Sequence, residues 1–394
     1  MYKGILILML TFSASSFSQI INIPDPVFKT MLMEHDTNGD GEIQVSEAEA
    51  VVALSLSINP DNPNKIQSLE GIEYFVNIFS LEFRQHSVES LDATMLPNLY
   101  QLICDGNEMT TINVAGLSNL EHLFVLRNNI STLDLTGLDN LRWLWTDDNP
   151  ISELDVHLLP SLETLFCRNN NLSELNLLPI SNLTRIRCGD NQISHLDVNH
   201  FMNLNELQTE DNVIANINLD GLQNLTNLNI SGNLITQLNV SQTGVRNLKC
   251  ANNVNLTQIF ASNGIVSAAG QFDFNNLPLL DFICIDEGEE NAVAQSGYNP
   301  SAFVGSGADC QLSIEENVVE KTIAVIPNPV LDLVDVQIHY EATLFQIVDV
   351  SGKRILSAAD KATVESAIIK LPAGLYFLRV YQDAESTTTR FIKL

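Results

Sequence analysis

Oxygen-bearing side chains recur at short, regular intervals in an acidic segment near the N-terminus. Residues 36–47 read Asp-Thr-Asn-Gly-Asp-Gly-Glu-Ile-Gln-Val-Ser-Glu. A hard cation such as Ca²⁺ takes about six to eight oxygen ligands in a flexible arrangement. The expected ligands are the side chains of Asp36, Asn38, Asp40 and Glu47 and the backbone carbonyl of Glu42. The segment therefore predicts a calcium site.

The segment resembles a single EF-hand loop, in which Gly41 would permit the sharp turn. Apolar residues at helical spacing over 25–35 and an alanine-rich stretch over 46–54 predict a short helix on each side, the second with Ser46 as N-cap. The alternative is a polar turn between helices. That alternative explains the glycine but not the glutamate at the twelfth place. Because extracellular loops of this type bind weakly, we expect a structural ion.

Aromatic and basic side chains recur at intervals of 21 residues in the middle of the chain. The aromatic members are Phe124, Trp145 and Phe166, with Trp143 two residues before Trp145. The basic members are Arg127, Arg168, Arg185 and Arg187. Aromatic rings and arginines are typical of binding hot spots, because they offer rigid area and planar donors. They predict recognition of a protein, a sugar or an acidic partner. The alternative is a stack with cation–π pairs that only stabilises the structure.

The residues that catalysis requires are not gathered in this sequence. The seven histidines are scattered over different parts of the chain, and four of the six cysteines fall in one apolar position of the repeat described next. Catalysis needs a nucleophile, a base or a metal cluster held at close quarters. The sequence therefore predicts a protein that is not an enzyme.

A repeat must position the aromatic and basic residues. Eight copies of L-x-x-L-x-x-x-x-N-x-L-x-x-L begin at 21-residue intervals, at Ile78, Leu99, Leu120, Leu141, Leu162, Leu183, Leu204 and Leu225. The apolar spacings of two and three argue against helices. Position 9 is asparagine in seven copies and His86 in the first. Stacked amides can pair with backbone groups that would otherwise be buried unpaired. A strict period of this length predicts a solenoid, whose coils bury their apolar faces against one another.

The repeats resemble the short bacterial class of leucine-rich repeat over roughly residues 65–285. The resemblance implies a curved solenoid with a parallel sheet on its concave side. Since 21 residues per coil leave little room for a helix, we expect extended segments on the convex side too. In this family positions 3, 5, 7 and 8 of each copy point from the concave sheet to solvent. That places the aromatic residues and arginines on one face of a mainly β fold.

Length and charge limit the remaining possibilities. The chain has 394 residues, enough for two or three domains, and a net charge of −29, which disfavours nucleic acid and anionic membranes as partners. Residues 1–18 read as a signal peptide, with Lys3, an apolar run and small residues before Gln19. No later stretch approaches the length of a membrane span. The composition predicts an exported protein without an integral membrane segment.

The cysteines fall into two groups. Cys104, Cys167, Cys188 and Cys250 all occupy position 6 of their repeats, which faces the core, so we expect buried free thiols there. Cys284 and Cys310 lie beyond the repeats, where a disulfide between them could close the C-terminal end of the array.

The last seventy or so residues alternate apolar and polar side chains, as in Val334, Val336 and Ile338, which predicts a small β-sandwich. This segment resembles the type A C-terminal sorting domain of type IX secretion substrates. The matching motifs are Pro327-Asn328-Pro329-Val330, Ile347-Val348-Asp349-Val350-Ser351-Gly352-Lys353, Leu371-Pro372-Ala373-Gly374-Leu375-Tyr376 and the terminal Phe391-Ile392-Lys393-Leu394. The resemblance implies passage through the outer membrane by the type IX secretion machinery.

Five segments follow from these patterns. They are a signal peptide (1–18), an EF-hand-like helical cap (19–64), a leucine-rich repeat solenoid with its C-terminal cap (65–312), a linker (313–322) and a sorting domain (323–394). We expect a secreted or cell-surface protein of a Gram-negative bacterium that binds a protein or other macromolecule on its concave face, in adhesion or recognition. The alternatives are a structural surface component without a defined ligand and a glycan-binding, lectin-like protein.

Overall fold

The computed structural model describes residues 19–178, 180–298, 301–306, 323–326, 328, 330, 334–338, 342–349, 353–382 and 385–394. The chain divides into two compact units, Met1–Cys310 and Gln311–Leu394. The predicted signal peptide and the predicted linker both lie outside the described residues.

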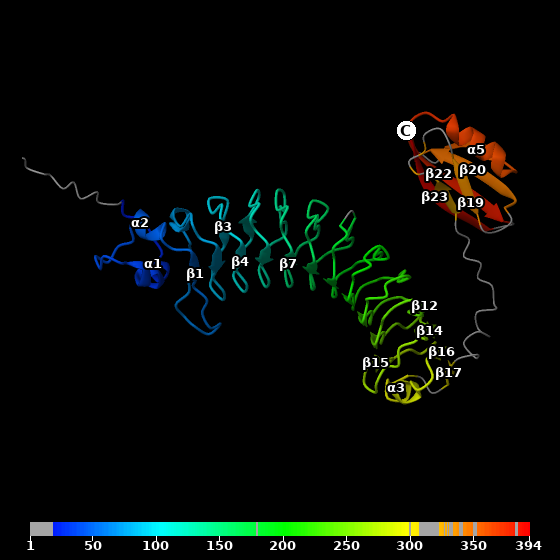
Figure 1. Cartoon of the computed structure of the whole chain (residues 1–394), viewed down its shortest axis with the longest axis horizontal. Coiled ribbons are helices and arrows are strands. Elements are labelled where there is room, and N and C mark those ends of the chain that lie inside the picture. The colour runs from blue at the N-terminus through cyan, green and yellow to red at the C-terminus, as the bar shows by residue number, and fades with distance from the viewer. Residues whose placement is uncertain are drawn as a thin grey trace, which may run out of the picture. The chain divides into compact units, whose positions relative to one another are not determined.

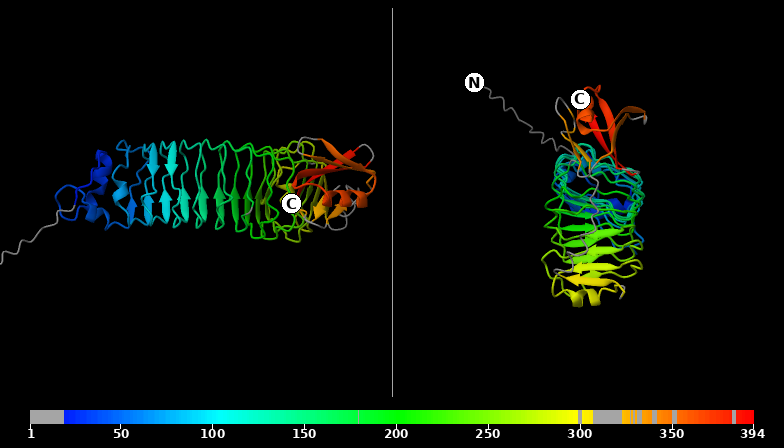
Figure 2. Two further views of the ribbon diagram at one scale, coloured as in Figure 1. Left: turned by 90° about the horizontal axis from the view of Figure 1, so that it is seen from above. Right: turned by 90° about the vertical axis from the view of Figure 1, so that its right-hand side faces the viewer.

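Unit 1 is a stack of coils whose principal element is a parallel sheet of eleven strands. Figures 1 and 2 show the coils side by side, with this sheet along the inner side of the curve. In spatial order the strands are β1 (Ala53–Ser55), β2 (Ser80–Glu82), β4 (Gln101–Ile103), β6 (His122–Phe124), β7 (Trp143–Trp145), β8 (Thr164–Phe166), β9 (Arg185–Arg187), β10 (Glu206–Gln208), β11 (Asn227–Asn229), β13 (Asn247–Lys249) and β15 (Phe272–Asp273). The solenoid and its mainly β class are thus confirmed.

The register of this sheet follows from the constant repeat length. Leu123 pairs with Leu144, which pairs with Leu165, so equivalent leucines form one column through the core. All three are fully buried. The residues on either side of each leucine alternate to the opposite face of the strand. A repeat of fixed length therefore fixes which side chains lie on the outer face of the concave sheet.

The position 9 asparagines form the predicted ladder. The Asn128 amide donates to the carbonyls of Cys104 (3.1 Å), Val125 (3.0 Å) and Leu126 (3.1 Å). Its oxygen accepts from the Met109 N–H of the preceding coil at 3.1 Å. One side chain thereby satisfies backbone groups of two adjacent coils, which are otherwise too buried to reach water.

His86 replaces asparagine in the first repeat and performs the same task as a neutral ring. Its Nδ1 accepts from the Ile66 N–H at 3.1 Å, so Nε2 carries the proton that is donated to the Leu56 carbonyl at 2.6 Å. Burial lowers the pKa of His86 below the ordinary value of 6.5. A ring protonated on both nitrogens would lose the acceptor at Nδ1.

Acid should therefore loosen the first coil. Because the folded pKa of His86 is depressed, its stabilising contribution is complete above pH 6.5 and is lost as the pH falls below that value toward the folded pKa. We expect the protection factor of the Ile66 amide to fall over this range in the native protein but not in His86→Asn, which restores the repeat's own residue. An equal fall in both proteins would contradict this role.

A small cap covers the N-terminal end of the array. It contains α1 (Pro26–Leu32), the 3₁₀ helix η1 (Met33–His35), α2 (Val45–Ala48) and the 3₁₀ helix η2 (Ile72–Tyr74). The helix predicted over 46–54 is wrong in extent, because α2 ends at Ala48 and β1 then joins the parallel sheet. Its predicted N-cap is also wrong. Gln44 is the N-cap, in a capping box with Glu47.

The convex side carries short strands, as expected from the repeat length. They are β3 (Ser90–Asp92) paired with β5 (Thr111–Asn113), and a parallel sheet of β12 (Gln237–Asn239), β14 (Gln258–Phe260), β16 (Phe282–Ile285) and β17 (Phe303–Ser306). Helix α3 (Glu290–Ala294) lies near the end of the array.

The four cysteines at position 6 are free and fully buried, as predicted. Burial raises the pKa of all four thiols, which keeps them protonated and unreactive. Cys284 takes part in a disulfide. Its expected partner, Cys310, lies outside the described residues, so that pairing stays a prediction.

The described residues of unit 2 form two antiparallel sheets and one helix. The strands are β18 (Ile323–Ile326) with β19 (Asp335–Ile338), and β21 (Arg354–Ala358), β20 (Leu344–Asp349), β22 (Gly374–Gln382) and β23 (Glu385–Lys393) in that spatial order. Helix α5 (Lys361–Ile369), which the alternating pattern did not predict, contributes Val364 and Ile368 to the core. Across the described part of the chain, no helix is both long and apolar enough to span a membrane.

Candidate functional site

The concave sheet presents two outward columns in the middle of the array. One runs through His122, Trp143, Thr164 and Arg185, and the other through Phe124, Trp145, Phe166 and Arg187. Between them, Leu144 is fully buried in the core. The structure therefore brings the predicted strand residues together on one face, and both tryptophans lie on its outer side.

The rings on this face stack on one another across neighbouring strands. Ring centroids are 4.5 Å apart for Phe124 and Trp145, 5.0 Å for Trp145 and Phe166, and 4.4 Å for His122 and Trp143. We call this set, with Phe79 and Tyr100, the aromatic band. Both faces of the Trp145 ring are covered, and Phe124 and Phe166 are only 8% and 3% exposed. Trp143, at 39% exposed, and Phe79, at 51%, are the open parts of the band.

The predicted rings were expected to point to solvent from the concave sheet, and the structure shows that Phe124 and Phe166 are nearly covered there. Parallel strands lie about 4.8 Å apart, which is close enough for rings on adjacent strands to cover each other's faces. The edges of the rings, rather than their faces, are consequently what the middle of the band offers to a partner.

Two arginines continue the two columns beyond Phe166, and both pair with the same carboxylate. Arg185 and Arg187 contact Glu206 at 2.9 and 2.7 Å, and the guanidinium carbon of Arg187 lies 4.4 Å from the Phe166 ring centroid. Burial raises the pKa of Glu206, but the two guanidinium groups outweigh that effect and hold it below its ordinary value. Glu206 thus stays ionised and fixes both arginines.

The other two predicted arginines lie at the ends of the strands. Arg168 contacts Asp190 at 2.6 Å, whereas Arg127 reaches Asp148 only at 3.7 Å and has a side chain 69% exposed. Arg127 also adopts a positive φ of 52°, where asparagine, aspartate or glycine is favoured. All four arginines are therefore near carboxylates, and Arg127 is the one most open to solvent.

Buried polar atoms without partners lie inside the band. Within the described residues, Trp145 Nε1 and His122 Nδ1 are buried and make no hydrogen bond. Burial raises the pKa of Asp147, two residues after Trp145, to about 6. Buried polar groups are normally satisfied in native proteins. These two ring nitrogens are therefore unsatisfied hydrogen-bonding atoms of the band.

The acidic loop 36–47 supplies the predicted oxygen ligands, but not as a preformed cluster. Asp36 accepts from the N–H groups of Gly39 (2.7 Å) and Gly41 (2.8 Å), which leaves its oxygens further lone pairs. Glu47 is already engaged, because its Oε1 accepts from the Thr37 N–H at 2.7 Å and from the Thr37 hydroxyl at 2.8 Å. Among the described side chains, no three His, Cys, Asp or Glu residues gather as a metal site requires.

The oxygen ligands of the loop thus fit a hard cation. To coordinate that cation, Glu47 would have to give up its hydrogen bonds to Thr37. Burial raises the pKa of Glu47, but these hydrogen bonds outweigh burial and hold it below the ordinary value. The carboxylate is therefore ionised at neutral pH, as a ligand must be.

Sequence reasoning missed three features of these sites. Phe79 and Tyr100 stack at 4.5 Å and continue the aromatic band from position 2 of their repeats. Their 21-residue spacing was the available signal. Glu206 was missed because no motif marks a carboxylate that serves two arginines. Asp25, which joins the cap to the array, was missed because its partners are about forty residues away.

Comparisons with known proteins agree with these two units. A family model described as the secretion system C-terminal sorting domain matches residues 324–394. No curated protein sequence matches the chain. Among solved structures, the functional domain of the internalin InlJ from Listeria monocytogenes, described as including a cysteine ladder, superposes with a TM-score of 0.55 at 22% identity, covering 73% of this chain and 62% of that one.

This chain therefore spans less than two thirds of the length of the InlJ domain. A second internalin from the same organism, InlF, is 18% identical with a TM-score of 0.40, covering 70% of this chain and 94% of that one. At 22% identity, the likeness to the InlJ domain shows the fold alone. The chain accordingly combines the leucine-rich repeat solenoid fold with a C-terminal sorting domain of the type IX secretion family at residues 324–394.

Proposed function

We propose that this protein is exported to the outer surface of a Gram-negative bacterium and there binds a protein partner through the aromatic band, in adhesion or recognition. The sorting domain marks a secreted or cell-surface protein. Leucine-rich repeat solenoids present extended concave surfaces that suit binding. The remaining question is which chemistry this concave face offers.

The observation that carries the proposal is a partly exposed aromatic band next to two arginines that ion pairs with Glu206 hold in place. Trp143 is 39% exposed, and Trp145 Nε1 has no hydrogen-bond partner in the described part of the chain. Glu206 holds Arg185 and Arg187 in place before any partner arrives, so little side-chain entropy remains to be lost on binding. Since the ring faces of Trp145 are covered, sugar stacking on the middle of the band is disfavoured, and a protein surface that meets ring edges is favoured.

Removing the open tryptophan tests this proposal. Trp143→Ala should weaken the partner's affinity at least about tenfold, as truncation of an aromatic hot spot does. The full chain would be immobilised, a surface partner captured and identified, and its dissociation constant measured for each variant. Leu158→Ala is the matched control, because Leu158 is also an exposed large apolar residue (46%) but lies outside the concave sheet.

The main alternative is a structural surface component, in which the stacked rings and the cation–π contacts only stabilise the sheet. In that case Trp143→Ala would lower the melting temperature without changing what the protein captures. Identical capture by the native protein, Trp143→Ala and Leu158→Ala would refute the recognition role.

Calcium at residues 36–47 is a second part of the proposal. Asp36, Asn38, Asp40, Glu47 and the carbonyl of Glu42 would hold the ion, which would supply a structural clasp at the N-terminal cap. The support is the set of oxygen ligands and the ionised state of Glu47. A ligand at tenfold excess over its dissociation constant stabilises the bound fold by about 1.4 kcal/mol.

Excess chelator should therefore lower the melting temperature of the cap, and millimolar calcium should restore it. Asp40→Ala should abolish the response, whereas Glu34→Ala, which removes an exposed acid just before the loop, should retain it. A melting curve that is the same with chelator and with calcium would contradict a calcium site in this loop.

A further inference from the structure

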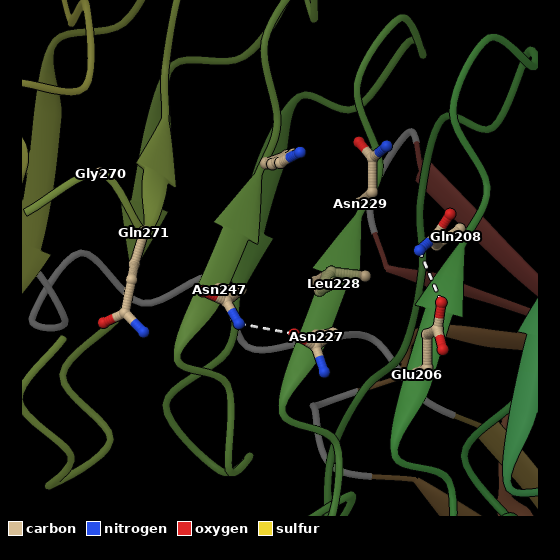
Figure 3. A pocket seen from close by; sticks show the side chains of 9 residues that line it. Glu206, Gln208, Asn227, Leu228, Asn229, Asn247, Gly270 and Gln271 are labelled. Carbon is tan, nitrogen blue, oxygen red and sulfur yellow. Dashed lines mark hydrogen bonds between the residues drawn. The ribbon is translucent and has the colours of Figure 1, made fainter. Parts of the chain in front are cut away.

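A polar groove lies on the C-terminal half of the concave sheet, beyond the aromatic band. It has a volume of about 540 Å³ and crosses strands β10, β11 and β13 (Figure 3). We call it the amide groove. Its principal side chains are Glu206, Gln208, Asn227, Asn229, Asn247 and Lys249, with Gln271 at its far side. Nothing in the repeat pattern singled out these residues, because amides are common throughout the array.

The amide groove is nearly neutral in a strongly acidic protein. The whole chain carries a net charge of −29. The one carboxylate in the groove, Glu206, is compensated by Arg185 and Arg187, and Lys249 is the single ammonium. Neutral carboxamides line the rest. The groove thus lacks both the cation cluster that an anionic polymer needs and the uncompensated acid that a basic partner needs.

Some of the amides fix one another, which orders the groove. Asn247 Nδ2 donates to Asn227 Oδ1 at 2.6 Å, and Gln208 Nε2 donates to Glu206 Oε1 at 2.6 Å. Asn229 Oδ1 accepts from the Ser231 N–H at 3.3 Å. Figure 3 shows the first two contacts across and along the strands. These bonds leave one end of Asn247, Gln208 and Asn229 directed to solvent or to a ligand. Asn227 is engaged at both ends, because its Nδ2 also donates to Thr226 Oγ1 at 3.0 Å.

Among the described residues, both donors and acceptors remain in the groove, and β13 carries one of each. The remaining donors are Asn229 Nδ2, Lys249 Nζ and Gln271 Nε2. The remaining acceptors are Gln208 Oε1 and Asn247 Oδ1. A hydroxyl both donates and accepts, so a ligand rich in hydroxyl groups can satisfy both kinds of atom without placing a charge in the groove.

The strand spacing favours a sugar chain over a polypeptide. An extended polypeptide presents groups on one side about every 6.6 Å, since it rises about 3.3 Å per residue and alternate residues share a side, whereas strands lie about 4.8 Å apart. A pyranose unit in an extended glycan is close to one strand spacing in length, so successive sugars meet successive strands. Protein hot spots also need apolar anchor pockets, and Leu228, the apolar residue of the groove, is 1% exposed.

We propose that the amide groove binds a neutral glycan, a chain of pyranose units without carboxylate or sulfate groups, running across β10, β11 and β13. This site is separate from the aromatic band and does not depend on the protein partner proposed above. The carboxamides orient the sugar hydroxyls by paired hydrogen bonds, and Lys249 donates to a ring or hydroxyl oxygen at the edge.

The test uses the full chain against immobilised neutral and acidic oligosaccharides, followed by calorimetric titration of the oligosaccharide that is best retained. Asn229→Asp keeps the side-chain shape but replaces the free donor by a charged acceptor, and should weaken binding at least about tenfold. Lys249→Met should also weaken it. Gln101→Glu makes the same amide-to-acid change on the same sheet outside the groove and should leave affinity unchanged.

Three results would overturn the proposal. They are retention of no neutral glycan, preferential retention of acidic glycans or of peptides, and equal affinity for the native protein and both groove variants at unchanged melting temperature. Should Asn229→Asp fail to fold, Lys249→Met decides the matter. Trp143→Ala should keep glycan affinity, and Asn229→Asp should keep the protein partner, so failure of one proposal is distinguishable from failure of the other.

Discussion

Asn170→Ala is expected to destabilise the array by about 2 to 4 kcal/mol, because it leaves buried backbone groups unpaired. The Asn170 amide donates to the carbonyls of Thr146, Cys167 and Arg168, each at 3.1 Å. Its oxygen accepts from the Ile151 N–H at 3.2 Å. Ile151 is fully buried, so water cannot replace the lost acceptor.

The adjacent residue provides a control of the same type. Asn171 is exposed, whereas Asn170 is buried, so Asn171→Ala should change stability by no more than about 0.5 kcal/mol. Chemical denaturation followed by circular dichroism would measure both. Because coils interact mainly with their neighbours, hydrogen exchange in Asn170→Ala should accelerate first around residues 146–170. Equal stability of the two variants would show that the ladder does not stabilise the coils.

Asp25→Ala is expected to detach the N-terminal cap. Asp25 Oδ1 accepts from the N–H groups of Val27 and Phe28, both at 2.9 Å, as the N-cap of α1. Its Oδ2 accepts from the N–H groups of Gln67 (2.7 Å) and Ser68 (3.1 Å), which precede the first repeat. Hydrogen bonds to a charged acceptor are worth about 1.5 to 3 kcal/mol each, so we expect a loss of at least about 3 kcal/mol in the cap.

The measurement is hydrogen exchange over residues 20–75, which should rise in Asp25→Ala while the middle of the array stays protected. Asp61→Ala removes an exposed aspartate of the same region and should change nothing. Protection of the cap in Asp25→Ala equal to that in Asp61→Ala would contradict the proposed attachment.

The same carboxylate predicts a response to acid. Burial raises the pKa of Asp25, but the four backbone N–H groups outweigh burial and hold it below the ordinary value of 3.8. A depressed folded pKa means that the stabilisation is complete above pH 3.8 and is lost as the pH falls through the folded pKa. Acid should therefore loosen the cap at two stages, first through His86 below pH 6.5 and then through Asp25 below pH 3.8.

The constant repeat length made much of the fold predictable. Since every coil has the same number of residues, side chains in equivalent positions stack in columns, and the sequence alone placed Leu144 inside and Trp143 outside. The asparagine ladder followed from the same phase, as did the buried thiols. Prediction was weakest where the repeat is absent, at the cap, where α2 is shorter than expected, and in unit 2, where α5 was not foreseen.

The sequence by itself determined which residues share the concave face, because a fixed period converts position in the chain into position on the sheet. Only the tertiary structure decided which of those residues contact one another and which of them are buried. Phe166 faces outward yet is 3% exposed, Glu206 holds two arginines, and Asp25 reaches Gln67. Each depends on side-chain contacts between coils that lie a strand spacing apart, and rotamers and burial, rather than periodicity, set those contacts.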